Sequence, residues 1–234
     1  MTAFRLPFGG GLVFSLLLWG AASEAAAQET LRGMVRIDLE PVYSREMDVP
    51  YPLDLETSRR RALEEASLNF AGMVYGWSFD YDIGEVARKI PERFDLVSLG
   101  SILFGDPRLS AADGEVRDAR FYLWSEYRAD LNQARRLEIW KGALYRSVQA
   151  RGSGPLSGWS DADSWAEGKQ AALEDAARAA VRSLLRASER NRPKEARGDL
   201  ALAEFPLYSI QAGRWAATAK FRIHVRELVP FAAY

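Results

Sequence analysis

The stretch Arg214-Trp-Ala-Ala-Thr-Ala-Lys-Phe-Arg-Ile-His-Val-Arg226 decides the fold class of this chain. Every second side chain, from position 215 to position 225, is apolar, and the positions between them are mostly polar. A period of two over this length indicates a β-strand with one face on a core. One covered face is typical of antiparallel sheets. The stretch therefore predicts an antiparallel strand whose second face meets water or a partner.

A helical segment occurs twice, 110 residues apart. Ala62-Leu-Glu-Glu-Ala66 returns as Ala172-Leu-Glu-Asp-Ala176, and apolar residues recur at helical spacing around both. Asp54 is a good N-cap for the first helix. The second helix is predicted to begin near Asp161 or Asp163, and its alanine content favours helix strongly.

Strands are predicted in the same order around both helices. Residues 35–42 alternate before the first helix, and residues 144–150 are their weaker counterpart. After the first helix, residues 75–82 alternate, and residues 97–104 predict another short strand. A long strand closes each half, one opening at Arg120 and the other at Arg214.

This order predicts an α+β fold made of two related β-α-β-β units, in which an alanine-rich helix covers each antiparallel sheet. The first unit would span residues 28–130. Residues 131–159 would hold a short helix at 131–140, a loop at 151–158 and the first strand of the second unit, and residues 160–234 its remainder. The alternative is that the similarity between the two helical segments arises by chance, because short alanine-leucine-glutamate helices are common.

Residues 1–27 have the pattern of a secretory signal peptide. Arg5 is the basic residue, residues 8–20 are almost wholly apolar or glycine, and Ala25-Ala-Ala27 is a small-residue cleavage site before Gln28. The apolar run is short for a membrane span. We therefore expect export to the periplasm or beyond, with no transmembrane span after cleavage. The alternative is an uncleaved N-terminal anchor.

Composition narrows the class of protein. Hydrophobic residues make up 48% and charged residues 27% of the chain, as in a globular protein. The net charge of −1 argues against broad attraction to nucleic acid or membrane surfaces. The chain has no cysteine, so disulfides, thiolate metal sites and a lipid-modified cysteine are excluded. We expect a protein that is not lipidated.

No residue pattern predicts catalysis, a cofactor or a metal. His224 is the only histidine, so no multi-histidine site or alternative triad base exists. The acids of residues 80–85 lack calcium-loop spacing, and residues 152–158 lack the lysine of a phosphate loop. We expect a protein that is not an enzyme. A carboxylate-dependent hydrolase remains the alternative, because acid pairs need only spatial proximity.

Two faces are candidates for partner binding, and each has a structural alternative. The first is the aromatic face of the strand after the first helix, which would otherwise be core covered by that helix. The second is the polar face of the last strand, which would otherwise be solvated. The candidate residues are Tyr75, Trp77, Phe79 and Tyr81 on the first face, and Lys220, Arg222, His224 and Arg226 on the second.

The pattern resembles the N-terminal module of flagellar assembly protein T and the small Lpp-twenty-type envelope lipoproteins. The residues that carry the resemblance are 58–66 with the strand 120–128, and 168–176 with the strand 215–226. The chain departs from the lipoproteins in having no lipidation cysteine. It departs also at Asn69, Phe70 and Met73, where smaller residues would be expected.

The resemblance implies an exported structural or interaction protein of the cell envelope, associated with a flagellar or other envelope assembly, with an envelope protein as partner and no cofactor. The alternative function is a periplasmic binding module for a glycan or another envelope ligand. The sequence does not identify the partner or the oligomeric state.

Overall fold

A computed structural model describes residues 29–40, 52–84, 89–156, 164–188 and 193–230. The predicted signal peptide lies outside the described residues, and so do the helix starts proposed at Asp161 and Asp163.

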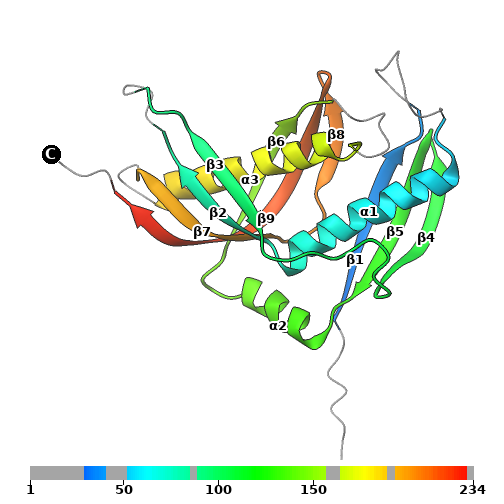
Figure 1. Ribbon diagram of the computed structural model, residues 1–234, viewed down its shortest axis with the longest axis horizontal. Coiled ribbons are helices and arrows are strands. Elements are labelled where there is room, and N and C mark those ends of the chain that lie inside the picture. Colours follow the sequence, from blue (N-terminus) through cyan, green and yellow to red (C-terminus); the bar gives the residue numbers. More distant parts are fainter. Residues whose placement is uncertain (1–28, 41–51, 85–88, 157–163, 189–192, 231–234) are drawn as a thin grey trace, which may run out of the picture.

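The described residues form three helices and two antiparallel sheets, so the predicted α+β class is confirmed (Figure 1). The elements in chain order are β1 (Thr30–Asp38), α1 (Leu55–Val74), β2 (Trp77–Asp82), β3 (Arg93–Ser98), β4 (Leu109–Arg117), β5 (Arg120–Arg128), α2 (Leu131–Trp140), β6 (Arg146–Gly154), α3 (Glu167–Ser188), β7 (Glu195–Leu202), β8 (Leu207–Gln211) and β9 (Arg214–Val229).

The strand pairing does not show two equal units. One sheet has the order β1-β5-β4, and the other has the order β3-β2-β7-β9-β6 with β8 paired to β9. The β2 and β3 strands of the first half pair with β7 of the second half, where Trp77 lies opposite Leu200. The sheets therefore have three and six strands, and the predicted duplication is not evident.

Helix α1 covers the three-stranded sheet and begins where the sequence predicts. The Asp54 side chain caps the helix by accepting a hydrogen bond from the Thr57 amide at 2.8 Å. Ala62, Ala66 and Phe70 of α1 are fully buried against this sheet, and the Phe70 ring stacks 5.7 Å from that of Tyr127. The small side chains of Ala62 and Ala66 let the helix approach the sheet closely.

Helix α3 packs closely on the six-stranded sheet through glycines of β6. The predicted loop 151–158 is therefore wrong in its first four residues, which belong to β6. Strand β6 continues to Gly154, because its glycines leave room for the helix backbone. A Cβ at Gly152 would lie 2.1 Å from the Ala176 amide nitrogen, and one at Gly154 would lie 2.1 Å from the Gly168 carbonyl oxygen. The glycines are thus a packing surface and not only a turn signal.

Two other expectations are corrected. Tyr75 is the C-cap of α1 and not part of a strand, because the chain turns at Gly76 with φ of +66°. The strand predicted at 97–104 is instead β3, which ends at Ser98. The short helix at 131–140 is confirmed, and a capping box between Asp130 and Gln133 begins it.

Contacts between side chains join the two sheets. The Phe205 ring packs over Gly33 of β1 and lies edge-on to Phe70 at 4.7 Å, while the Arg36 guanidinium donates to the Tyr208 carbonyl at 3.0 Å. The two sheets, side by side in Figure 1, are therefore packed together. Among the helices of the described residues, none has the length and apolar character needed to cross a membrane.

Candidate functional site

The polar face of β9 is the candidate that the structure leaves most open. The alternating side chains from Trp215 to Ile223 are buried beneath α3, as predicted. The opposite face of the strand carries exposed Lys220 and half-buried Arg222 and His224. The structure therefore brings these three predicted site residues together on one surface.

Strand β6 adds a third cation that sequence patterns did not reveal. In the antiparallel register, Arg151 lies opposite Thr218, and Gln149 lies opposite Lys220. Arg151 is exposed and is thus a diagonal neighbour of Lys220, at about 7–8 Å between Cα atoms. Arg151, Lys220 and Arg222 form a surface that we call the basic stripe. Only the pairing of β6 with β9 could have identified Arg151.

The cations of the basic stripe lack acidic partners. Among the described residues, no carboxylate oxygen lies within 4.0 Å of these three side chains. Neighbouring like charges on one sheet face repel each other. The stripe therefore has positive charge available for an external anion, although the whole chain carries a net charge of only −1.

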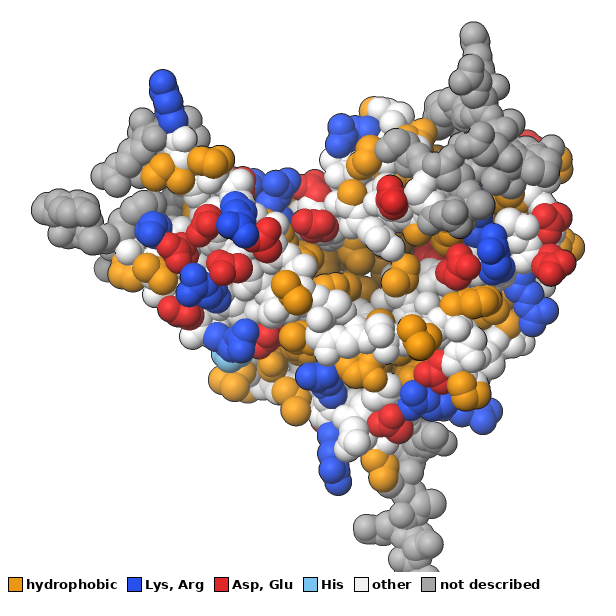
Figure 2. Space-filling model, in the orientation of Figure 1, with side chains coloured by type: hydrophobic (Ala, Val, Ile, Leu, Met, Phe, Trp, Pro, Cys, Tyr) orange, Lys and Arg blue, Asp and Glu red, His pale blue; other side chains and the backbone are white. Residues whose placement is uncertain are grey.

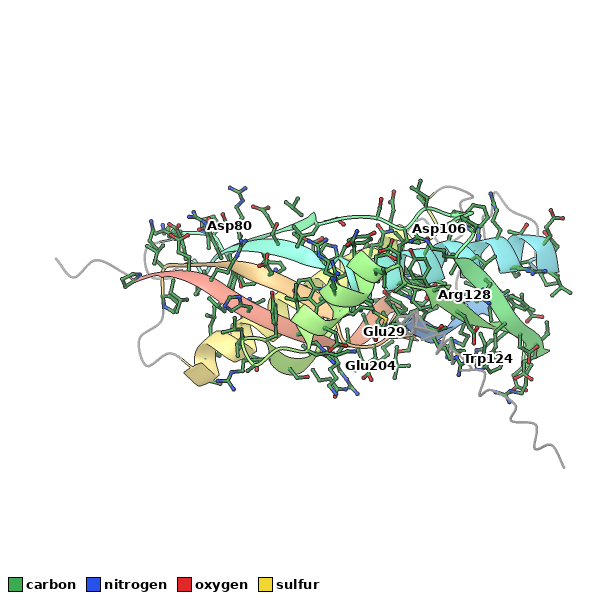
Figure 3. The ribbon with its side chains drawn as sticks, turned by 90° about the horizontal axis from the view of Figure 1, so that it is seen from below. Glu29, Asp80, Asp106, Trp124, Arg128 and Glu204 are labelled. Carbon is green, nitrogen blue, oxygen red and sulfur yellow. The ribbon has the colours of Figure 1, made fainter. Side chains whose placement is uncertain are left out.

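On the other half of the same sheet face, Arg197 lies among carboxylates of the same chain. Arg197 lies 3.0 Å from Asp80, 3.2 Å from Glu195 and 3.5 Å from Glu227. The hydrogen bond that Arg197 donates to Asp80 is the main reason that the pKa of Arg197 is raised. In Figure 3, Asp80 lies on the part of this sheet farthest from Trp124 and Arg128 of the three-stranded sheet. Arg197 thus differs from the three cations of the basic stripe, which have no carboxylate oxygen within 4.0 Å among the described residues.

His224 and Arg226 have partners within the protein. The His224 ring lies 5.3 Å from the Tyr145 ring in an edge-on contact, and Tyr145 in turn contacts Trp140 of α2. Arg226 forms an ion pair with Asp199 at 3.2 Å. These two predicted site residues therefore lie at the edge of the open surface and are structurally engaged.

The aromatic strand lies in different surroundings from the basic stripe. Phe79 and Tyr81 are only 3% and 1% exposed and belong to the core, but α3 covers them and not the first helix as predicted. Burial is the main reason that the pKa of Tyr81 is raised. Tyr75 accepts a hydrogen bond from Gln133 at 2.7 Å, and Trp77 is half-buried beside α1. Trp77 borders an open cavity between α1 and α3.

The described residues contain no group of three or more histidine, cysteine, aspartate or glutamate side chains placed to hold a metal ion. The basic stripe presents donors and positive charge and no paired acid and base. Its arrangement suits the binding of an anionic surface.

Comparisons with known proteins place the chain among relatives of undefined activity. A protein-family model matches residues 19–231. An uncharacterized protein of Treponema pallidum (strain Nichols) is 26% identical over 163 residues, which are 70% of this chain and 66% of the relative. No solved structure matches the chain.

Proposed function

The chain belongs to the protein family whose model matches residues 19–231, and we propose that it is an exported, non-enzymatic interaction protein of the cell envelope. Its partner would be an acidic protein that docks on the basic stripe. Association with a flagellar or other envelope assembly is part of the proposal, and it rests on the resemblance of the helix and strand pattern.

The observation that carries the proposal is the contrast within one sheet face. Arg197 and Arg226 are matched by acids of the same chain, whereas Arg151, Lys220 and Arg222 have no such acid among the residues that the structure describes. Carboxylates of a partner would relieve the repulsion among these cations, and complementary charge would speed encounter. Because the stripe is exposed, salt should weaken the complex.

Crosslinking in intact cells that produce a tagged copy tests this function, with fractionation of the same cells. The test variant Arg151→Glu/Lys220→Glu/Arg222→Glu reverses the stripe. The control variant makes the same change in charge elsewhere on exposed side chains and is Arg59→Glu/Arg128→Glu/Arg186→Glu. Circular dichroism checks that both variants fold.

We expect the wild type and the control to capture one envelope protein with an acidic segment, and the stripe variant to lose it. Equal capture by both variants would overturn the assigned surface. A wild-type protein that captures nothing and runs free in the periplasmic fraction would overturn the proposed function.

A further inference from the structure

A groove of about 350 Å³ opens where α1, α3 and the β2–β3 hairpin meet. Helix α1 contributes Leu68 and Gly72 to one wall, and helix α3 contributes Leu173 and Ala177 to the other. The two residues named on each helix lie four positions apart, so each helix turns one stripe towards the groove. The groove lies on another face of the protein from the basic stripe.

Most of the groove wall is apolar. Trp77 and Leu96 form its base from β2 and β3, and Ile102 borders it from the segment after β3. Leu103 and Phe104, which follow Ile102 in the chain, are 71% and 54% exposed. Figure 2 shows hydrophobic side chains in the hollow at the centre of this face. A mostly apolar groove of this size is typical of a site for an apolar ligand.

One end of the groove is polar. Lys169 donates to Glu65 at 2.5 Å, and their side chains are only 7% and 9% exposed. Lys169 is the third residue of α3, so Ala177 lies about 12 Å farther along the helix. The ion pair therefore lies near one end of the α3 wall, and the exposed Glu174 also borders the groove, between Leu173 and Ala177.

The Glu65–Lys169 pair carries no net charge but can form further hydrogen bonds. Lys169 has three N–H donors, and Glu65 has about four acceptor positions, while one hydrogen bond joins them. A charged group placed beside this pair would bring a third, unpaired charge into a nearly buried position, at high cost in free energy. A hydroxyl or an amide would bring no charge.

We propose that the groove binds an uncharged amphiphile, with its hydrocarbon chain against Leu68, Trp77 and Leu173 and its hydroxyl or amide head at Glu65 and Lys169. The volume lies at the lower end of the range of small-molecule sites, which starts at about 300 Å³. This ligand site goes beyond the proposed protein docking and does not depend on it.

Isothermal titration calorimetry with the full mature protein tests the site. Three probes share a ten-carbon chain and differ in the head group: 1-monodecanoylglycerol is uncharged, decanoate is anionic and decyltrimethylammonium is cationic. All are used below their micelle-forming concentrations. Leu68→Arg places a charge in the wall, and Leu55→Arg is its control on the same helix. These leucines are 44% and 59% exposed, so both variants should fold.

We expect the glyceride to bind saturably at one site and both charged probes to bind at least about tenfold more weakly. Leu68→Arg should weaken glyceride binding about tenfold or more, and Leu55→Arg should not change it. Failure of the glyceride to bind would overturn the proposal. So would equal affinity for the charged probes, or equal binding by the Leu68→Arg variant.

Discussion

Glu65 of α1 and Lys169 of α3 form a nearly buried ion pair, 2.5 Å from oxygen to nitrogen. The two residues are 104 positions apart in the chain, so the pair joins two distant helices. Three aromatic rings surround the ammonium group: those of Trp165, Tyr208 and Trp215 have centroids 5.6, 5.4 and 5.0 Å from it. The pair therefore joins the helix on the three-stranded sheet to the core of the six-stranded sheet. Cation–π attraction adds to its stabilisation.

We expect Lys169→Met to destabilise the protein by about 3–5 kcal/mol, because it leaves the Glu65 carboxylate nearly buried without its partner. Urea unfolding followed by circular dichroism measures the change in the free energy of unfolding. The double variant Glu65→Leu/Lys169→Met should recover most of the loss, since apolar side chains often replace a buried pair at little cost. If the free energy of unfolding of Lys169→Met is within about 1 kcal/mol of the wild-type value, the ion pair does not stabilise the fold in this way.

A second prediction concerns the contact of α3 with β6. Gly152→Ala should destabilise the fold by about 1–3 kcal/mol or more, because the new Cβ would overlap the backbone at Ala176 and the helix would have to move. Ser153→Ala is the matched control, because its side chain is exposed and its bond to Asp175 uses the backbone amide. Thermal unfolding compares the two, and equal melting temperatures would contradict the close approach.

Patterns within single segments were enough to predict much of the secondary structure. The alternation from Trp215 to Val225 predicted β9 and its buried face, and Asp54 marked the start of α1. The pairing of β2 with β7 was not predictable, because nothing local to Trp77 or Leu200 shows that they lie opposite each other. Pairing between distant strands depends on the packing of the whole sheet.

The residues of the candidate site were likewise predictable only where the pattern lies within one segment. Lys220 and Arg222 follow from the period of one strand, whereas Arg151 joins them only through the register of β6 with β9. The groove was missed because its two helical walls belong to different halves of the chain. Its polar end pairs Glu65 with Lys169, and no local spacing relates these two residues.

The buried face of α3 gives a third prediction. Ala176 has no exposed surface, so Ala176→Asp would bury an unpaired charge and should lower the free energy of unfolding by about 3 kcal/mol or more. Arg186 is exposed in the last turn, so Arg186→Asp should cost about 1 kcal/mol or less, through the helix dipole. Urea unfolding of both variants decides this, and equal small effects would mean that the assigned face is wrong.

Acid should destabilise the fold through the carboxylates around Arg108. The Arg108 guanidinium lies 3.0 Å from Asp106 and 2.6 Å from Asp130. The hydrogen bond from Arg108 lowers the pKa of Asp106, and the hydrogen bond from the Gln133 amide is the main reason that the pKa of Asp130 is lowered. A pKa below the unfolded value of about 3.9 means that the folded state holds its protons less tightly. The stabilisation is therefore present above about pH 4 and is lost as pH falls through the folded pKa values.

We accordingly expect the urea midpoint of the wild type to fall between about pH 5 and pH 3, and to fall less steeply in Asp106→Asn/Asp130→Asn. The double variant should also be less stable than the wild type at pH 7, because it weakens both ion pairs and the cap of α2. Glu174→Gln/Glu167→Gln makes the same change in net charge on exposed positions of α3 and serves as the control. If the double variant and the wild type lose stability in parallel down to pH 3, the carboxylates around Arg108 are not the source of the acid sensitivity.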